Sequence, residues 1–109
     1  MTPDRDPGPV FSALADPTRR EVLRKLSQEG PATLSEISAG MPVSRQAIAK
    51  HLSLLEEAGL IEGAGATRRR IYTLTPGPLE GAVGWMADVG ADWDERLERL
   101  RRIVERRSR

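Results

Sequence analysis

Residues 33–59 read TLSEISAGMPVSRQAIAKHLSLLEEAG and contain two helix patterns separated by a turn. Thr33 and Glu36 have the spacing of a capping box, which predicts a helix that starts at this point. The run Gly40-Met41-Pro42 ends that helix after about two turns, because glycine and proline both interrupt helical backbone. The first half of the stretch therefore predicts a short helix followed by a tight turn.

The second half of the stretch predicts the best helix of the chain. Ser44 can cap its N-terminus, and Gly59 can stop it at the other end. Ile48, Leu52 and Leu55 recur at spacings of four and three, which places them on one face. Residues 33–59 thus predict a helix, a tight turn and a second helix, which is the helix-turn-helix arrangement.

The polar side of the second helix carries groups suited to base and phosphate recognition. With the apolar face turned inward, Gln46, Lys50 and Ser53 point the opposite way. Ser44 and Arg45 lie at the N-terminal end, which is the part of such a helix that enters a DNA major groove. Arginine and lysine suit guanine edges, and glutamine suits adenine. The alternative for this helix alone is an ordinary solvated face.

Residues 60–74 predict a β-hairpin, which after a helix-turn-helix forms a wing. A Gly-rich turn separates two short strands, the second running from Arg68 to Leu74. Arg68, Arg69 and Arg70 concentrate positive charge where phosphates or a minor groove would lie. Strand alternation predicts that Arg68 and Arg70 share one face and that Arg69 lies on the other.

Residues 79–107 predict a long helix with an apolar stripe on one side. The stripe is a heptad pattern in which only Gly90 is small. We call these positions the heptad seam: Leu79, Val83, Met86, Gly90, Trp93, Leu97, Leu100 and Val104. A helix of about 40 Å is too long for this chain to cover by itself, so we expect the seam to pack on a second copy. The alternative is a cover for the chain's own core, and Gly81, Gly84 and Gly90 leave a bend open.

The segment before the helix-turn-helix predicts a polar tail and two helices. Residues 1–9 are expected to be a flexible tail, and Val10–Ala15 a short apolar helix. Asp16-Pro17 then opens the helix Thr18–Gln28, with aspartate as the cap and proline at the first helical position. The expected fold is mostly α, of the α+β class: a single winged helix-turn-helix domain over residues 10–107. It would carry a two-stranded β wing and long N- and C-terminal dimerisation helices.

Composition narrows the class of protein. The chain has 109 residues, 17 basic and 16 acidic side chains and no cysteine. That length fits one domain, and the absence of cysteine excludes disulfides and thiolate metal sites. No apolar run approaches the roughly 18 residues that a membrane span needs, and residues 1–9 do not resemble a signal peptide. We therefore expect a cytoplasmic protein without a membrane partner.

Nothing in the sequence predicts an enzyme or a cofactor site. His51, the only histidine, lies beside the apolar face of its helix, where a packing or hydrogen-bonding role is expected. One imidazole without cysteine cannot build a usual zinc site. The acids of the last helix could hold a hard cation, but a solvated face paired with nearby arginines is the simpler interpretation. No catalytic residues, metal or cofactor are predicted.

Several motifs, taken in order, resemble the ArsR family of bacterial winged-helix repressors. They are FSALADPTRR at 11–20, VSRQAIAKHL at 43–52, LEEAGLI at 55–61 and RIYTL at 70–74. The resemblance implies a homodimeric repressor that binds a palindromic operator in double-stranded DNA. It implies DNA contacts by Ser44, Arg45, Gln46, Lys50 and the wing arginines. It also implies that the last helix, with Trp93, forms the dimer.

The metal-binding residues of metal-sensing members are missing from this chain. Those members carry a cysteine pair in the first helix of the helix-turn-helix, or His, Asp and Glu ligands in the last helix. Here residues 33–37 read TLSEI, and the last helix has no histidine. The chain thus resembles the branch without a recognisable inducer site, and its effector is unknown. Two alternatives remain: a winged helix used for protein contact without DNA readout, and a repressor with a metal or small-molecule effector at the dimer helices.

Overall fold

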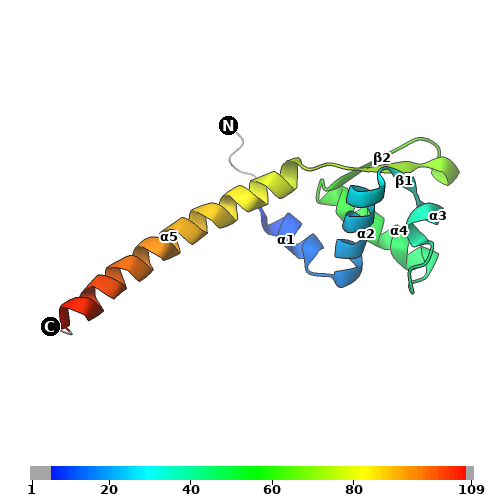
Figure 1. Ribbon diagram of the computed structural model, residues 1–109. Helices are drawn as coiled ribbons and strands as arrows, with labels where there is room; N and C mark the ends of the chain where they lie inside the picture. Colours follow the sequence, from blue (N-terminus) through cyan, green and yellow to red (C-terminus); the bar gives the residue numbers. More distant parts are fainter. Residues whose placement is uncertain (1–5, 108–109) are drawn as a thin grey trace.

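The computed structural model describes residues 6–107 and consists of a helical body from which one long helix projects (Figure 1). Residues 1–5 of the predicted tail lie outside the described residues. The elements in chain order are α1 (Gly8–Leu14), α2 (Pro17–Glu29), β1 (Ala32–Thr33), α3 (Leu34–Ser38), α4 (Arg45–Glu57), β2 (Ile61–Ala64), the 3₁₀ turn η1 (Thr67–Arg69), β3 (Ile71–Leu74) and α5 (Gly77–Arg107).

A closed core holds the body together. Ile48, Leu52 and Leu55 of α4 are all buried, as the spacing predicted, and they meet apolar side chains from the other elements of the body. The largest fully buried side chains are Val22, Ile37, Ile48, Leu52, Leu55 and Leu60. Because α4 supplies half of this set, the direction of its exposed face is fixed by the packing of its apolar face.

Side-chain caps set where the helices of the body begin. Thr33 and Glu36 form the predicted capping box of α3. Ser44 Oγ accepts a hydrogen bond of 3.1 Å from the backbone N–H of Ala47, which confirms the predicted start of α4. Asp16 caps α2 in the same way, with Pro17 at the first helical position. These caps satisfy N–H groups that have no partner inside the helix.

The sheet has three antiparallel strands in the order β1-β3-β2, one more than the predicted two-stranded wing. β1 pairs with β3 through only two residues, Ala32 and Thr33, which is too short for a periodicity signal. The predicted strand from Arg68 is also wrong at its start. Residues 67–69 form the 3₁₀ turn, in which the N–H of Arg69 bonds the carbonyl oxygen of Ala66 at 2.9 Å. The expected strand alternation therefore does not apply to Arg68 and Arg69.

The two terminal helices differ in length. α5 has 31 residues and runs without a break through Gly90, from two residues before the predicted start. α1 has only seven residues, so the expectation of a long N-terminal helix is wrong. The reason is local: Pro17 disfavours helical backbone at the residue before it, and Asp16 takes an extended conformation as the cap of α2. α1 also begins at Gly8, inside the segment expected to be tail.

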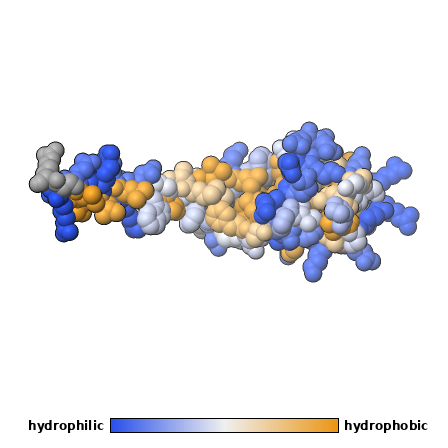
Figure 2. Space-filling view, turned by 60° about the horizontal axis from the view of Figure 1, so that its bottom comes forward, coloured by the Kyte–Doolittle hydropathy of each residue, from blue (hydrophilic) through white to orange (hydrophobic). Residues whose placement is uncertain are grey.

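Only the first turns of α5 pack on the body. Ala82 is buried, Leu79 is half-buried against the core, and Trp85 meets Phe11 of α1 edge to face at 5.6 Å between ring centres. Beyond this point the helix projects, which gives extents of 70 × 36 × 20 Å. Hydrophobic residues gather along the helix and where it joins the body (Figure 2). No helix within residues 6–107 is long and apolar enough to span a bilayer.

Candidate nucleic-acid interface

The exposed side of α4 carries the predicted recognition residues. Gln46, Lys50 and Ser53 are all exposed, on the side away from the buried Ile48 and Leu52. No hydrogen bond within the described residues holds the amide of Gln46 or the ammonium group of Lys50 in place. These two groups can therefore reach a ligand without first breaking a protein contact.

The N-terminal end of α4 is tied to α3. Arg45 donates a hydrogen bond of 2.8 Å from Nη2 to Ser35 Oγ, and both side chains are exposed. Ser44 is also exposed, but its Oγ is occupied by the cap to Ala47. Ser44 thus shapes the helix start, while the remaining guanidinium donors of Arg45 face outward with their full charge.

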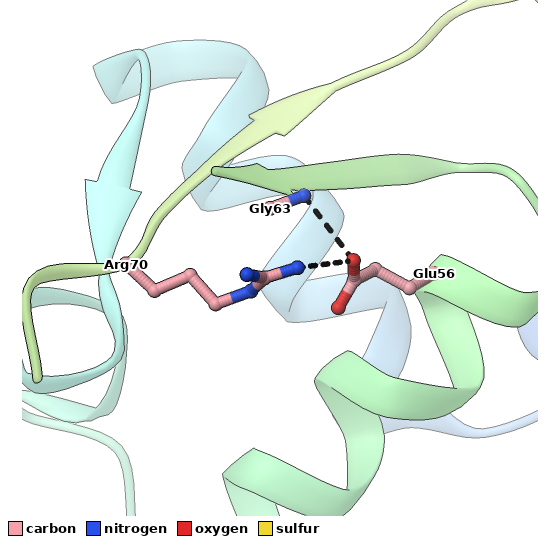
Figure 3. Close-up of polar contacts among 3 residues, drawn as sticks. All are labelled: Glu56, Gly63 and Arg70. Atoms are coloured by element: carbon pink, nitrogen blue, oxygen red, sulfur yellow. Dashed lines mark hydrogen bonds and ion pairs between the residues drawn. The ribbon is translucent and has the colours of Figure 1, made fainter. Parts of the chain in front are cut away.

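The three wing arginines have two different environments. Arg68 and Arg69 are exposed on the 3₁₀ turn. Arg70 is half-buried: its Nη2 lies 3.2 Å from Glu56 Oε2, and its guanidinium carbon lies 5.9 Å from the centre of the Tyr72 ring. The same Glu56 oxygen accepts the N–H of Gly63 at 3.3 Å (Figure 3). Arg70 therefore joins the wing to the C-terminal half of α4, and its charge is largely neutralised by Glu56.

A groove of about 600 Å³ separates α4 from the wing. It brings Arg45 of α4 together with Arg68 and Arg70 of the wing, and its lining contains no acidic residue. The lining residues are Leu34, Ser35, Arg45, Ala49, Thr67, Arg68, Arg70 and Tyr72. Arg45 and Arg68, which form no ion pair within residues 6–107, give this groove a site for anions such as phosphate groups.

Sequence reasoning missed Ser35, Thr67 and Tyr72 of this groove. Ser35 and Thr67 are small polar residues in a helix and a turn, and nothing in the sequence distinguishes them from others of their kind. Tyr72 of β3 lies two residues after Arg70, whose backbone is also extended, so alternation turns both side chains to the same side. That alternation was the one available signal.

A second arginine contact fixes α4 from behind. Arg19 of α2 donates from Nε to the carbonyl oxygen of Ala13 at 2.8 Å, and its Nη1 lies 3.2 Å from His51 Nδ1. His51 is half-buried and hydrogen-bonded, which confirms the role expected for it. The contact connects the end of α1, α2 and α4 through one side chain. It holds the recognition helix in a fixed position relative to the helix that packs on α5.

Metal-ligating groups do not gather anywhere in residues 6–107: no three His, Asp or Glu side chains lie close enough to hold an ion. The acids of α5 are instead spread along an exposed helix, and Glu98 pairs with Arg101 at 2.8 Å. That hydrogen bond and the arginine charge lower the pKa of Glu98 below its ordinary value.

The heptad seam is largely exposed beyond the body. Leu79 differs from the other seam residues because it packs partly on its own core. The exposed large side chains of α5 are Val83, Trp85, Met86, Trp93, Leu97, Leu100, Ile103 and Val104, each between 47% and 60% exposed. An apolar stripe of this length is unusual on a soluble single chain.

Known proteins resemble the chain in sequence and in fold. A family model described as a helix-turn-helix domain matches residues 14–64, from the end of α1 to β2. The HTH-type transcriptional regulator Rv2034 of Mycobacterium tuberculosis is 32% identical over 96% of this chain and 94% of its own. The transcriptional repressor SdpR of Bacillus subtilis is 32% identical over 71% of this chain and 84% of its own.

The solved structures extend this likeness to the long helix. An ArsR-like transcriptional regulator from Rhodococcus sp. RHA1 superposes with a TM-score of 0.80, at 35% identity, over 94% of this chain and 96% of its own. Coverage of that extent includes the winged helix-turn-helix and most of α5. The chain therefore belongs to the ArsR family of winged helix-turn-helix proteins, and it is a DNA-binding transcriptional regulator.

Proposed function

We propose that the protein is a homodimeric repressor that reads a palindromic operator in double-stranded DNA. The observation that carries this proposal is the acid-free groove between α4 and the wing, with Arg45 and Arg68 at its sides and Gln46 and Lys50 exposed beside it. Cationic and amide groups that form no ion pair within the described residues are concentrated on α4 and the wing, and α4 is long enough to lie in a major groove. This combination is typical of a DNA contact rather than of a protein-contact surface.

The groups divide between base contacts and phosphate contacts. Gln46 and Lys50 extend from the N-terminal half of the exposed face of α4, where they can reach base edges in the major groove. Arg45, Arg68 and Arg69 neutralise phosphates on either side of that groove. Ser53 lies one turn further along α4, at the margin of the contact. Arg70 holds the wing against α4 through Glu56.

Dimerisation supplies the second half of the operator. Two copies related by a twofold axis present two recognition helices, and half-sites about 34 Å apart match successive turns of one DNA face. The exposed seam, from Val83 to Leu100, is the surface that a second copy would cover. A dimer that occupies promoter DNA would repress transcription. The relative SdpR is named a repressor, which supports repression rather than activation.

The test is a fluorescence-anisotropy titration with duplex DNA from immediately upstream of the protein's own gene. Lys50→Ala and Gln46→Ala are expected to weaken specific binding about tenfold each, since one good base contact contributes roughly 1–3 kcal/mol. Gln28→Ala removes the same amide from an exposed position on α2 and serves as the matched control for Gln46→Ala. Circular dichroism checks that all three variants keep the fold.

A scrambled duplex at two salt concentrations completes the test. The proposal expects tight binding to the upstream duplex alone, with affinity falling as salt rises. If the Lys50 and Gln46 variants bind as the wild type does, this face does not read the bases. Equal weak binding to both duplexes, with every genomic fragment tried, would favour a winged helix used for protein contact.

A further inference from the structure

The heptad seam of α5 is symmetric about its own midpoint. Its spacings are four and three in strict alternation, beginning and ending with four, so each position has a mate equidistant from the point between Ala91 and Asp92. The mates are Leu79 with Val104, Val83 with Leu100, Met86 with Leu97 and Gly90 with Trp93. A seam with this symmetry can pair with a second copy that runs in the opposite direction, large residue facing large residue. The single small residue then faces the tryptophan.

Gly90 has no explanation within its own chain. A glycine inside a helix is about 1 kcal/mol less favourable than alanine. A Cβ added at Gly90 would have no heavy atom within 4 Å, and the backbone there is ordinary helix rather than the left-handed conformation that favours glycine. No side chain within residues 6–107 therefore fills the space over Gly90. Gly81 and Gly84 also face open space, but they lie off the seam.

Trp93 is the side chain that this space would fit. Its side chain is 55% exposed, and its ring contacts the guanidinium of Arg96 from its own helix, at 5.7 Å. An indole ring is the largest of the natural side chains, and close packing between helices favours a small residue opposite a large one. Gly90 is the only small residue in the seam.

The charges of α5 favour the same direction of pairing. Residues 77–95 contain five acids and no base, whereas residues 96–107 contain six arginines and two acids. A parallel pair would place like halves side by side, which is unfavourable. An antiparallel pair places the acidic half of each helix beside the arginine-rich half of the other. Glu80 and Arg101 then flank the seam at positions that face each other.

We propose that α5 pairs antiparallel with α5 of a second copy, centred between Ala91 and Asp92, so that each Trp93 covers the partner's Gly90. The pairing rests on the proposed homodimer and specifies its register. Ala82 is the buried residue of each α5, and this register places the two Ala82 positions about 29 Å apart along the axis. An antiparallel pair therefore holds the two bodies near opposite ends of the helix pair, whereas a parallel pair would bring both bodies to one end.

The register can be tested by disulfide cross-linking, because the chain has no cysteine. Met86→Cys and Leu97→Cys are prepared separately and mixed one to one under reducing conditions, so that subunits exchange. The mixture is then oxidised and run on a non-reducing gel. The mixture is expected to give a cross-linked heterodimer, because Met86 faces the partner's Leu97. Each variant alone is expected to stay uncrosslinked, because the two copies of either position lie about 16 Å apart, too far for a disulfide.

The outcomes separate a wrong register from a wrong dimer. Cross-linking of each variant alone would establish a parallel pair and overturn the proposal. No cross-link in the mixture, with both variants still dimeric by sedimentation, would overturn the register while leaving the homodimer intact. Monomers in sedimentation would overturn the homodimer itself. Asp88→Cys, on the outer face of α5, is the control that should cross-link with neither variant.

A second pair of variants tests the contact over Gly90. Gly90→Leu is expected to weaken dimerisation at least tenfold, because the added side chain occupies the space of the partner's Trp93. Gly84→Leu adds the same side chain and the same helix propensity off the seam, where a Cβ also meets nothing, and it should dimerise as the wild type does. Equal dimer dissociation constants for both variants, measured by sedimentation equilibrium, would overturn the proposed contact.

Discussion

The body and the projecting part of α5 use the same kind of apolar pattern with opposite results. In the body, Ile48, Leu52 and Leu55 on the inner face of α4 are at most 1% exposed. In α5 beyond Ala82, large residues at equivalent helical spacing are about half exposed, and Val83 is 60% exposed. Periodicity therefore indicates which face of a helix is apolar. It does not indicate whether the chain itself can cover that face.

The difference follows from length. α4 has 13 residues and lies within the body, so neighbouring elements reach all of its apolar face. α5 has 31 residues, and after its first turns no other element within residues 6–107 packs against it. Stability of the body is consequently a property of one chain. Stability of the projecting helix is expected to depend on protein concentration, because a second chain must supply the missing surface.

The largest effect expected is from Leu52→Ala in the body. Leu52 is 1% exposed in the closed core, so its truncation leaves a cavity and should lower the free energy of unfolding by about 3 kcal/mol. Urea unfolding followed by circular dichroism measures this loss. The loss should be the same at low and high protein concentration. A loss that grows on dilution would contradict the division between the two regions.

A smaller effect is expected from Leu97→Ala in the projecting helix. Leu97 is 56% exposed, so the substitution leaves the core of the body intact. It should instead weaken dimerisation by about 2 kcal/mol, roughly thirtyfold, through lost apolar burial between chains. Sedimentation equilibrium measures the dissociation constant, with Asp88→Ala on the outer face as the control. An unchanged constant for Leu97→Ala would mean that the seam is not the dimer surface.

The wing arginines allow a similar comparison at the candidate DNA interface, between a side chain with a partner in its own chain and one without. Arg68 has no ion pair in the structure, whereas Arg70 is paired with Glu56. Arg68→Ala should therefore reduce the slope of log affinity against log salt by about one. Arg70→Ala should change that slope much less. The measurement is anisotropy at four or five salt concentrations, and equal changes for both variants would show that Arg70 leaves Glu56 to bind phosphate.

Sequence reasoning predicted the parts of the fold that local rules determine. Asp16, Thr33 and Ser44 are residue types that are strongly preferred at the N-cap of a helix, and each caps a helix in the structure. The spacing of three apolar residues in α4 determines which side of this helix is buried and which is exposed. The exposed positions of Gln46 and Lys50 follow from that spacing. The exposure of these two candidate contact residues was therefore predictable before any packing was known.

Contacts between distant residues were not predictable in this way. β1 is recognised as a strand only because β3 lies beside it. The sequence predicted a strand from Arg68, yet residues 67–69 form a 3₁₀ turn shortly after Gly65, which has a positive φ. The pairing of Arg70 with Glu56 spans 14 residues and depends on how the wing packs against α4. Each of these outcomes depends on tertiary packing, which overrides local preference.

The smallest effect expected is a loss of stability at acid pH, to which one carboxylate in each region contributes. Asp16 lies in the body and Glu98 in the projecting part of α5, and both have a lowered pKa. The backbone N–H groups of Arg19 and Thr18 hold the pKa of Asp16 below its ordinary value of 3.8, and Arg101 lowers the pKa of Glu98. A lowered pKa means that the folded chain binds fewer protons than the unfolded chain. The contribution of each group is therefore present above its ordinary pKa and lost as pH falls through the folded value.

Salt distinguishes the two carboxylates. Neutral N–H groups hold Asp16, so the difference in unfolding free energy between pH 7 and pH 3 should be smaller in Asp16→Asn than in the wild type, at low and at high salt. Asparagine caps a helix about as well as aspartate, so stability at pH 7 should barely change. Glu98 depends on an exposed ion pair, so any effect of Glu98→Gln should disappear in about 1 M salt, where the Debye length is roughly 3 Å. Loss of the Asp16→Asn effect in high salt would mean that charge, rather than helix capping, lowers the pKa of Asp16.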